Sequence, residues 1–448
     1  MQPPFDRQFV FDAKKIFTQH FKNQLSMKKN MILSMAALLM FAITSCKKSD
    51  TTPPVQQALT VTAISPSSGP KTTVVNIAGT NFGTVANDVK VYFNNVQATV
   101  QTVTNTNITA VVPAGAGSGT VKVEKNNVQV NGPAFTYQQT GIVSTFAGSS
   151  QGYVDATGNA AQFNIPLGVV KDAAGNLFVC DRDNHRIRKI TPAGVVTTFA
   201  GGAAGFADGT GIAARFNQPY AITMDAAGNF YIGDRINHAI RKMTAAGVVT
   251  TLAGNGTAGD QLGTGNAAMF NEPLGVAADA AGNVFVADYI NHKIKKVTPA
   301  GVVTTFANVN QVFGLAFDTA GNLYFTEYGY NLVSKLSPAG AYTVVAGQLG
   351  SSGAQDGNGS AASFNFPAGI AVDSNGNLYV CDAFNNRIRK ISSTGQVTTL
   401  AGDSSGQTDG VGTAASFNTP IAICGDFVNN TLYIGDFNNH RIRKIILE

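Results

Sequence analysis

Tryptophan is absent from this sequence, charged residues make up only 13% of it, and just four cysteines occur in its 448 residues. Without tryptophan a sugar-stacking surface is less expected, although it is not excluded, because tyrosine can also stack on sugars. Helical periodicity of apolar residues is missing from the repeated units described below, which argues against helices there. Glycine is abundant instead, with 48 residues, and this suits short strands joined by turns.

The charge balance offers no basic surface. The full chain has 31 basic and 26 acidic residues. Residues 1–45 contain six of the basic and two of the acidic ones, so subtraction leaves 25 basic and 24 acidic residues in the remainder. A nucleic-acid binder carries a basic footprint. We therefore expect no nucleic acid among the partners.

The N-terminal region has the pattern of an export signal. Met27 and two lysines precede an apolar run over residues 31–42, which is too short to span a bilayer as a helix. The four residues ending at Cys46 resemble a bacterial lipobox, which implies that Cys46 is lipidated and becomes the mature N-terminus. An ordinary secretion signal is the alternative. Lys47 does not match an inner-membrane retention signal, which mildly favours the outer membrane.

These features divide the first part of the chain. Residues 1–26 are predicted to be untranslated or disordered, with translation starting at Met27, and residues 27–45 form the signal peptide. Residues 46–58 are rich in Ser, Thr, Pro and Gln and are predicted to be a tether. The expected localisation is the cell envelope, through a lipid anchor.

The rest of the chain is dominated by one phrase that occurs six times. Its clearest copy runs from Asp181 to Ile190, and the copies begin at residues 181, 234, 288, 327, 382 and 436. The steps of 53, 54, 39, 55 and 54 residues indicate a repeat architecture. Each unit contains four short β-prone segments separated by glycine-bearing turns, which predicts an antiparallel meander. Six such sheets arranged radially make a six-bladed β-propeller.

A count of strands supports closure of the ring. The fourth-strand pattern occurs at residues 142–147, before any complete unit, whereas the last unit stops after its third strand. We predict that the first strand pairs with the last sheet. The predicted fold is therefore all-β.

Two family resemblances follow from these residues. The Asn-His-Arg-Ile-Arg-Lys-Ile phrase, after Gly-Asn-Leu-Tyr-Val-x-Asp, resembles the NHL repeat over residues 141–448, with a worn copy in the fourth unit. Residues 59–138, with Ile64-Ser-Pro-Ser-Ser-Gly-Pro and then Ala78-Gly-Thr-Asn-Phe-Gly, resemble the IPT/TIG family. That resemblance implies an immunoglobulin-like β-sandwich that acts as a spacer or interaction module.

Most of the repeated polar residues have a structural interpretation. Histidine occupies one repeat position in four units and asparagine in the other two, which favours hydrogen bonding in a turn over metal binding. The strand-end acids, such as Asp181, are expected to cap that turn, and Arg186, Arg188 and Lys189 are expected to form a solvated strand face. The Asp-Gly-x-Gly loop before most units could suggest calcium, but turn chemistry is favoured, with Phe-Asn-x-Pro docking the loop. Cys180, Cys381 and Cys424 are predicted to be unpaired and buried.

Function is expected where the repeat is broken. The residue after the strand-end acid and the variable residue of Phe-Asn-x-Pro both change from unit to unit, and the fourth unit lacks the loop. We predict a shallow groove at the fourth unit, against the alternative of ordinary surface variation. The candidate ligand-binding residues are Tyr289, Tyr328, Tyr330, Arg182, Arg235, Tyr220 and Glu272.

The function favoured by these features is a lipid-anchored binding or scaffold protein of the envelope, with a protein, peptide or glycan as ligand. No catalytic residue, cofactor or metal ligand is assigned. A metal-dependent propeller enzyme of the lyase or lactonase type, using the central channel, is the alternative, and a purely structural surface protein is a third hypothesis. Whether the chain is an enzyme stays open at this point.

Overall fold

The computed structural model describes residues 58–448, which form strands, turns and short 3₁₀ segments. The predictions for residues 1–26, residues 27–45 and nearly all of the tether fall outside the described residues. Within the described part of the chain, none of the helices has the length and apolar character needed to cross a bilayer.

Residues 59–138 form a β-rich domain. Its third strand shows why: the side chains of Val74–Thr80 are alternately exposed and buried, so that Val75 and Ile77 point into the core. Phe82, Phe93 and other apolar side chains complete this core. The strands are β1 (Thr60–Ser65), β2 (Ser68–Gly69), β3 (Val74–Thr80), β4 (Val89–Phe93), β5 (Val96–Val103), β6 (Asn107–Val111), β7 (Gly119–Lys125) and β8 (Val128–Tyr137), with a 3₁₀ turn η1 (Ala86–Asp88).

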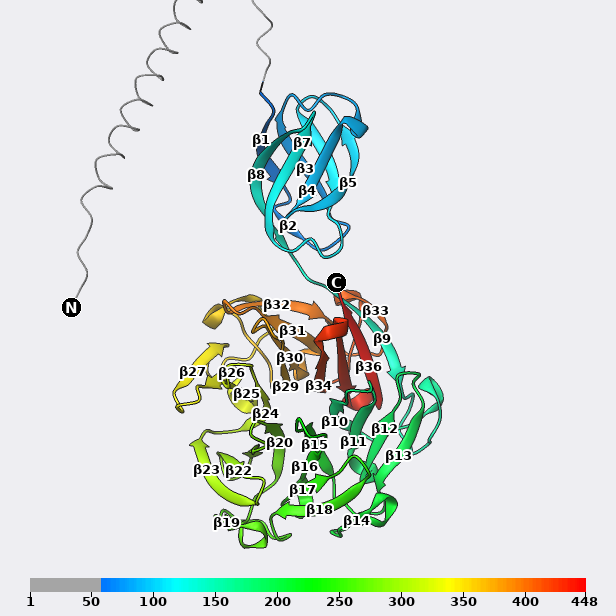
Figure 1. Ribbon diagram of the computed structural model, residues 1–448, viewed down its shortest axis with the longest axis vertical. Coiled ribbons are helices and arrows are strands. Elements are labelled where there is room, and N and C mark those ends of the chain that lie inside the picture. Colours follow the sequence, from blue (N-terminus) through cyan, green and yellow to red (C-terminus); the bar gives the residue numbers. More distant parts are fainter. Residues whose placement is uncertain (1–57) are drawn as a thin grey trace, which may run out of the picture. The chain divides into compact units, whose positions relative to one another are not determined.

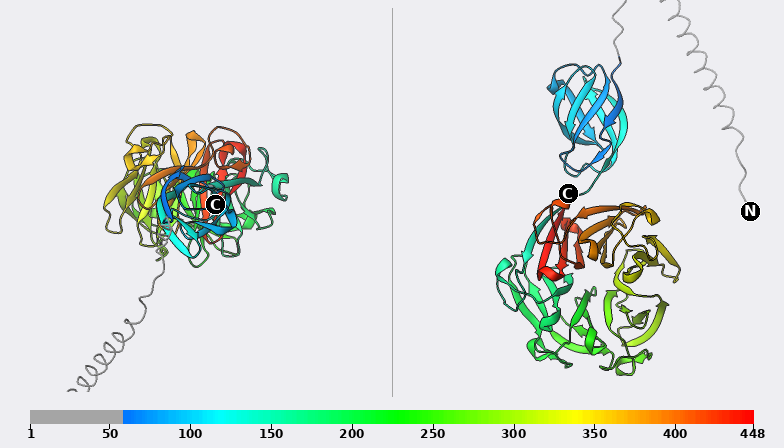
Figure 2. Two further views of the ribbon diagram at one scale, coloured as in Figure 1. Left: turned by 90° about the horizontal axis from the view of Figure 1, so that it is seen from above. Right: turned by 180° about the vertical axis from the view of Figure 1, so that it is seen from behind.

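Residues 141–448 form a six-bladed propeller, as predicted. The blades are numbered in chain order and are arranged in a ring around a central axis (Figure 1 and the right view of Figure 2). Residues of the innermost strands line a cavity at this axis, here called the channel. The innermost strands are β10 (Pro166–Lys171), β15 (Pro219–Met224), β20 (Pro273–Ala278), β24 (Val312–Phe317), β29 (Pro367–Val372) and β34 (Pro420–Asp426). The second strands are β11 (Leu177–Asp181), β16 (Phe230–Asp234), β21 (Val284–Asp288), β25 (Leu323–Glu327), β30 (Leu378–Asp382) and β35 (Thr431–Asp436).

The outer half of each blade repeats in the same way. The third strands are β12 (Arg186–Ile190), β17 (Ala239–Met243), β22 (Lys293–Val297), β26 (Leu332–Leu336), β31 (Arg387–Ile391) and β36 (Arg441–Leu447). The outer strands are β13 (Val196–Gly201), β18 (Val248–Ala253), β23 (Val302–Asn308), β27 (Tyr342–Ala346), β32 (Gln396–Ala401) and β9 (Gly141–Ala147). Two-residue edge strands follow on four blades: β14 (Gly209–Thr210), β19 (Gly263–Thr264), β28 (Gly357–Asn358) and β33 (Gly410–Val411).

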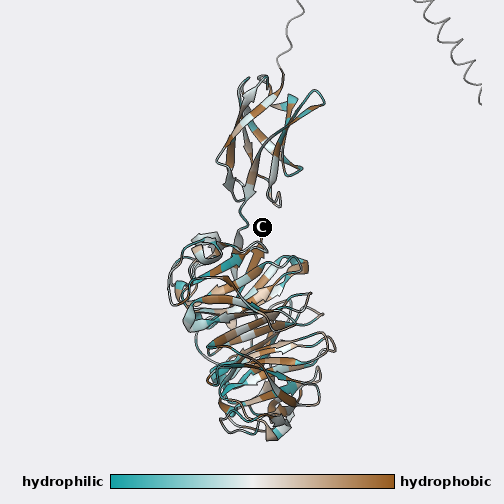
Figure 3. Cartoon of the chain, turned by 90° about the vertical axis from the view of Figure 1, so that its left-hand side faces the viewer, coloured by the Kyte–Doolittle hydropathy of each residue, from teal (hydrophilic) through white to brown (hydrophobic). Residues whose placement is uncertain are grey.

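The second strands are apolar almost throughout because both of their faces are covered by neighbouring blades. In β11 all five residues are buried, and Phe178 and Cys180 pack against Ile222 and Ile232 of blade two. Hydrophobic residues follow the strands in Figure 3, whereas the loops are largely hydrophilic. Cys180 and Cys381 are free and buried, as predicted, while Cys424 is free but only partly buried.

The ring closes as the strand count predicts. Strand β9 pairs with β36 in an antiparallel register that places Val143 opposite Ile445 and Ala147 opposite Ile442. The two strands lie side by side in Figure 1, although they come from opposite ends of the propeller sequence. Strand β33 then pairs with the free side of β9, so blade six is assembled from both ends of the module.

Glycine lets the innermost strands approach each other closely around the channel. A Cβ added at Gly275 would lie 2.0 Å from the carbonyl oxygen of Phe313, and one at Gly314 would lie 2.4 Å from that of Ala368. Neither contact is sterically possible without movement of the backbone. These glycines therefore set the width of the channel.

Candidate functional site

Each regular blade contains a buried ion pair between an acid at the end of its second strand and a cation on its third strand. The guanidinium of Arg188 donates to Asp181 at 2.6 Å, and both side chains are fully buried. Asp181 also accepts the backbone N–H of Asn164 and the side-chain amide of Asn184. The equivalent pairs have N–O distances of 2.6–2.8 Å and are Arg241–Asp234, Lys295–Asp288, Arg389–Asp382 and Arg443–Asp436.

These pairs correct one prediction and refine another. Arg188 and its equivalents are buried, so the expectation of a solvated face was wrong for that position; Arg186 and Lys189 are partly exposed. Asp181 does bind a residue of the following turn, but it accepts the side-chain amide of Asn184 and caps no backbone N–H of that turn. Burial raises the pKa of Asp181 to about 6, although its hydrogen bonds and Arg188 act in the opposite direction.

The same cations dock the loops that precede the blades. The second nitrogen of Arg241 donates to Asp208 of the loop at 2.8 Å, and the ring of Phe216 lies 5.3 Å from the guanidinium carbon. The acids in the equivalent loops are Asp155, Asp260, Asp356 and Asp409. The loop acid is therefore bound to the cation of its blade, and Phe-Asn-x-Pro docks the loop, as predicted.

Blade four replaces this whole arrangement. Glu327 takes the place of the acid, Ser334 takes the place of the arginine, and the docking loop is missing. The hydroxyls of Ser334 and Tyr342 both donate to Oε1 of Glu327 at 2.6 Å. The blade thus keeps a buried acid but has no cation beside it in the described part of the chain.

The repeated histidines join neighbouring blades. His185 has a left-handed backbone, with φ of 55°, and its Nδ1 accepts the backbone N–H of Gln218 in the next blade at 3.1 Å. Asparagine does the same where it replaces histidine, as in the bond from Phe366 N–H to Asn331 Oδ1 at 2.9 Å. Histidine and asparagine both tolerate this backbone conformation and both supply an acceptor. The predicted turn role is confirmed, and the bond from Ile165 to His440 extends it across the ring closure.

The five residues that donate these N–H groups are also left-handed, and so is Gln311 at the equivalent position of blade four. These six residues precede the innermost strands and have φ of 52° to 61°: Ile165, Gln218, Glu272, Gln311, Phe366 and Thr419. β-branched and bulky residues rarely adopt this conformation. The backbone conformation is the same in all six blades while the side chain varies, so the ring presents five kinds of side chain at one mouth of the channel.

One side of this mouth is a continuous polar chain, here called the polar arc. Arg182 binds Asp183 through two nitrogens, at 2.8 and 3.1 Å, and Gln218 donates to Asp183 at 3.3 Å. Arg235 donates to the side-chain oxygen Oε1 of Gln218 at 3.0 Å and to Oε2 of Glu272 at 2.7 and 3.0 Å. The arc runs over blades one to three, and each of its members is partly exposed.

The opposite side is aromatic, here called the aromatic arc. The ring of Tyr328 stacks on Phe313, with centroids 4.9 Å apart, and meets Phe366 edge-on at 4.7 Å. Phe384 adds a further ring 4.6 Å from Phe366 and is 50% exposed. These side chains come from blades four and five, so the mouth is polar on one side and aromatic on the other.

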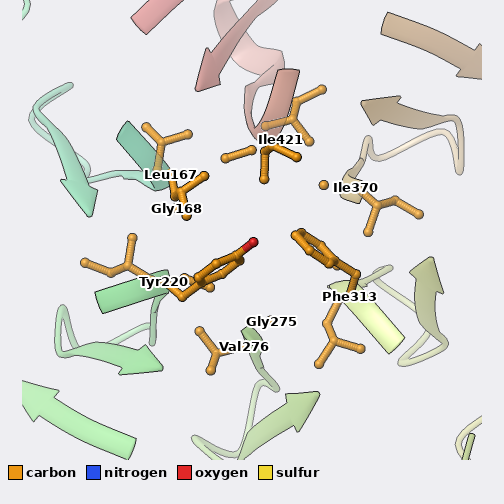
Figure 4. A pocket seen from close by; sticks show the side chains of 16 residues that line it. Leu167, Gly168, Tyr220, Gly275, Val276, Phe313, Ile370 and Ile421 are labelled. Atoms are coloured by element: carbon orange, nitrogen blue, oxygen red, sulfur yellow. The ribbon is translucent and has the colours of Figure 1, made fainter. Parts of the chain in front are cut away.

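Tyr220 stands between the two arcs. Its ring meets Phe313 edge-on at 5.6 Å, and the two side chains project into the channel from opposite sides (Figure 4). The cavity beneath them has a volume of about 90 Å³ and is lined by backbone and apolar side chains of the innermost strands. That is room for only a few water molecules.

The tyrosine hydroxyls at the mouth have no partner within residues 58–448. Neither Tyr220, Tyr289 nor Tyr328 has a side-chain hydrogen bond in that range. Burial raises the pKa of Tyr328 to about 12. Burial raises the pKa of Tyr220 further still, although the positive charges of Arg182 and Arg235 act to lower the pKa of Tyr220. The hydroxyls therefore stay protonated and can both donate and accept.

The structure gathers six of the seven candidate residues at this mouth. Tyr220, Tyr289 and Tyr328 pack against one hydrophobic cluster, and Arg182, Arg235 and Glu272 belong to the polar arc. Tyr330 stands apart, since its ring makes no contact with the cluster in the described residues. The sequence interpretation did not include Asp183, Phe313 or Phe384. For Phe384 the available signal was an aromatic residue directly after the variable position in blade five.

No three His, Cys, Asp or Glu side chains gather as a possible metal site in residues 58–448. The acids at the mouth are already engaged, because Glu272 binds Arg235 and Asp183 binds Arg182. What the arrangement offers chemically is binding: flat apolar rings on one side, fixed hydrogen-bonding groups on the other, and free hydroxyls between them.

Comparison with known proteins identifies both parts of the chain. The IPT/TIG domain family matches residues 59–138, and the NHL repeat family matches residues 163–190, 270–297 and 364–391. The chain therefore carries an IPT/TIG domain followed by a propeller of NHL repeats.

Among curated proteins, the chain is 29% identical over 287 residues to Protein SUPPRESSOR OF QUENCHING 1, chloroplastic, of Arabidopsis thaliana. The match covers 56% of this chain and 27% of that protein. NHL repeat-containing protein 2 of Homo sapiens is 37% identical over 100 residues, covering 21% of this chain and 14% of its own length. The chain thus spans under a third of the length of these relatives.

Solved structures share the fold over most of the chain. A structural genomics protein of unknown function from Bacteroides thetaiotaomicron has a TM-score of 0.58 at 24% identity, covering 88% of this chain and 99% of its own. An auxiliary nutrient binding protein from Bacteroides ovatus has a TM-score of 0.56 at 21% identity, with the same coverage. At this identity the likeness shows the fold alone.

Proposed function

We propose that this protein binds a glycan at the mouth of its propeller channel and that a lipid on Cys46 anchors it in the cell envelope. The observation that carries the binding proposal is the division of the mouth into a polar and an aromatic arc. A sugar ring has apolar C–H faces that stack on aromatic rings, and hydroxyls at its edge that need planar polar partners. Tyr328 and Phe384 supply rings, and Arg182, Gln218 and Glu272 supply hydrogen-bonding groups.

Two further points support the proposal. The three unpartnered tyrosine hydroxyls lie where a ligand with many hydroxyls would need donors and acceptors. The similar structure from Bacteroides ovatus is described as an auxiliary nutrient binding protein, and a nutrient taken up at the envelope fits the export signal before Cys46. The IPT/TIG domain would then serve as a spacer between anchor and propeller.

Binding is tested with purified full-length protein on an oligosaccharide array, followed by calorimetry on any hit. Tyr328→Ala removes the central ring of the aromatic arc, and we expect it to weaken binding at least about tenfold, or ~1.4 kcal/mol. Tyr330→Ala is the matched control, because it removes the same residue type from the same turn without touching the arc. Binding that survives Tyr328→Ala unchanged would place the ligand elsewhere.

The same preparation tests the rival functions and the anchor. Stoichiometric zinc or calcium in elemental analysis, with turnover of a hit sugar or lactone, would favour an enzyme over a binding protein. If the chain is a purely structural surface protein, no array hit should respond to Tyr328→Ala. Metabolic labelling with a radioactive fatty acid should mark the wild type, and Cys46→Ser should abolish that label.

A further inference from the structure

The outer edge of blade four is open, whereas the chain itself covers this edge in the other blades. In blade two, Gly209–Thr210 pairs antiparallel with Val249 and Val248 of the outer strand. Blades three, five and six have the same two-residue strand, and blade one has the single bridge from Thr157 to Val195. Strand β27 of blade four has no such partner within residues 58–448.

The side chains of β27 have changed together with this loss. The position of Tyr342 holds a valine in the five other blades, with exposures of 0–2%: Val143, Val196, Val249, Val303 and Val397. Tyr342 itself is 47% exposed. Val344, at 44%, replaces a threonine that elsewhere binds the loop acid, as Thr198 does through its backbone N–H to Asp155 at 3.0 Å. The N–H of Thr198 faces away from the other strands of its blade. Val344 occupies the equivalent position, so its N–H is an outward-facing donor at the open edge of blade four.

A buried carboxylate lies beneath the same edge. Glu327 is 5% exposed, and both of its hydroxyl donors bind Oε1. Oε2 has no hydrogen bond or ion pair within residues 58–448. The acid at this position in every other blade has a cation at 2.6–2.8 Å. Oε1 is satisfied by its two hydroxyl donors, whereas Oε2 is unpartnered without being fully buried, so a cation supplied from outside could reach Oε2 and form a charge-assisted hydrogen bond with it.

We propose that the edge of β27 is a docking site for an extended basic segment of a partner protein. The segment pairs antiparallel with Tyr342 and Ala341, which are the equivalents of Val249 and Val248, in the register that Gly209–Thr210 adopts on β18, and becomes the fifth strand of blade four. A backbone carbonyl of the segment accepts the outward N–H of Val344, since a lysine or arginine in place of the loop acid cannot accept it. A lysine or arginine of the segment, at the place that Asp208 takes in blade two, reaches inward to Oε2 of Glu327.

The sign of the charge selects this occupant. In blade two the buried cation Arg241 binds an acid of the covering loop, because its two terminal nitrogens donate to Asp234 and to Asp208. In blade four the inner group is itself an acid, so a second acid at the edge would be repelled. The proposal is independent of the channel mouth, which lies at the opposite end of the radial strand order from β27.

A synthetic peptide provides the probe. It has the sequence of residues 203–216, the chain's own covering segment, with the substitution Asp208→Arg. The unaltered peptide, which keeps Asp208 and has no net side-chain charge, is the matched control, and a scrambled peptide of the basic composition controls for non-specific charge. Fluorescence anisotropy with full-length protein at physiological salt should show binding of the basic peptide at least about tenfold tighter than binding of either control.

Protein variants locate the bound peptide. Glu327→Gln should weaken the basic peptide about tenfold, whereas Glu124→Gln, which removes one charge in the IPT/TIG domain, should leave it unchanged. Val344→Pro removes the outward N–H without taking a bond from β26 and should abolish binding. If Val344→Pro does not melt like the wild type, Glu327→Gln carries the test alone.

Three results would overturn the proposal. Equal affinity for the scrambled peptide would show simple charge attraction. Undiminished binding to Glu327→Gln would remove the carboxylate from the site. A wild-type dimer in sedimentation that Val344→Pro converts to monomer would mean that a second copy of the chain occupies the edge.

Discussion

Removing one buried arginine should cost far more than removing the acid that docks the loop. Arg389 donates to Asp382, Asp356 and two backbone carbonyls, and its side chain is fully buried. In Arg389→Ser, Asp382 is left buried without a cation, and two carbonyls lose their donors. Breaking a buried pair from one side costs about 3–5 kcal/mol.

The loop acid provides the contrast. Asp356 is 46% exposed at its side chain, so water can replace its contacts in Asp356→Ala, and we expect a loss of about 1 kcal/mol or less. Arg387→Ser is a second control on the same strand, because its side chain is 21% exposed. Guanidinium unfolding followed by far-UV circular dichroism measures all three, provided the m-values agree. A cost below about 1 kcal/mol for Arg389→Ser would refute the view that the cation compensates a buried acid.

Blade four suggests a partial rescue. There Glu327 accepts the hydroxyl of Ser334 at 2.6 Å where other blades have an aspartate and an arginine. Asp382→Glu combined with Arg389→Ser should recover part of the loss caused by Arg389→Ser alone. The recovery should stay incomplete, since blade five has no hydroxyl equivalent to that of Tyr342. A double variant no more stable than the single one would show that the longer acid does not reach the serine.

Other residues give further predictions. His185→Ala should cost ~1–2 kcal/mol in unfolding free energy, because Gln218 N–H loses its acceptor, whereas His185→Asn should be nearly neutral. Burial lowers the pKa of His185, His238 and His440 below 6.5 in the folded protein. Their contribution to the free energy of unfolding is therefore complete above pH 6.5 and declines as the pH falls through the folded-state pKa. Replacing all three by asparagine should make the free energy of unfolding in urea depend less on pH between pH 7 and 5. Gly275→Ala should destabilise the protein by ~1–3 kcal/mol, measured by thermal melting, because the new Cβ clashes with the Phe313 carbonyl. Gly340→Ala is the control: its Cβ would lie in open space, so it should lose only the free energy needed to hold alanine at a positive φ.

The sequence was sufficient to predict the fold because each repeated element has a local physical cause. Period, turn glycines and β-branched runs specify one blade, and the displaced fourth-strand pattern before blade one specifies how the ring closes. The register of β9 on β36 follows, since Val143 occupies the position of Val196 and Val397. A repeated position is also easy to interpret when its role is confined to one turn, as for His185.

Side chains that link separated segments could not be predicted in the same way. Arg188 lies between Arg186 and Lys189 in a basic run, so the composition of the run predicted that all three side chains are exposed to solvent. Strand alternation puts Arg188 on the face opposite to Lys189, but the partners that make its burial favourable come from the second strand and from a loop 33 residues away. The mouth residues were found from variation alone, which identifies a position but not its contacts. Phe384 was missed for that reason.

The differences in blade four make sense only as one coupled change. Loss of the loop removes the outer acid, and an inner arginine without that acid would carry excess buried charge, so serine at position 334 is the compatible partner. Serine is short, and the longer Glu327 is needed to reach it. Threonine at position 344 then has no acid to bind, and valine replaces it. The valine buried at the edge of other blades has lost its cover, and Tyr342 occupies its place with a hydroxyl that reaches Glu327. An edge kept open by four coordinated changes is better explained by a partner strand than by decay of the repeat, since decay would alter these positions independently.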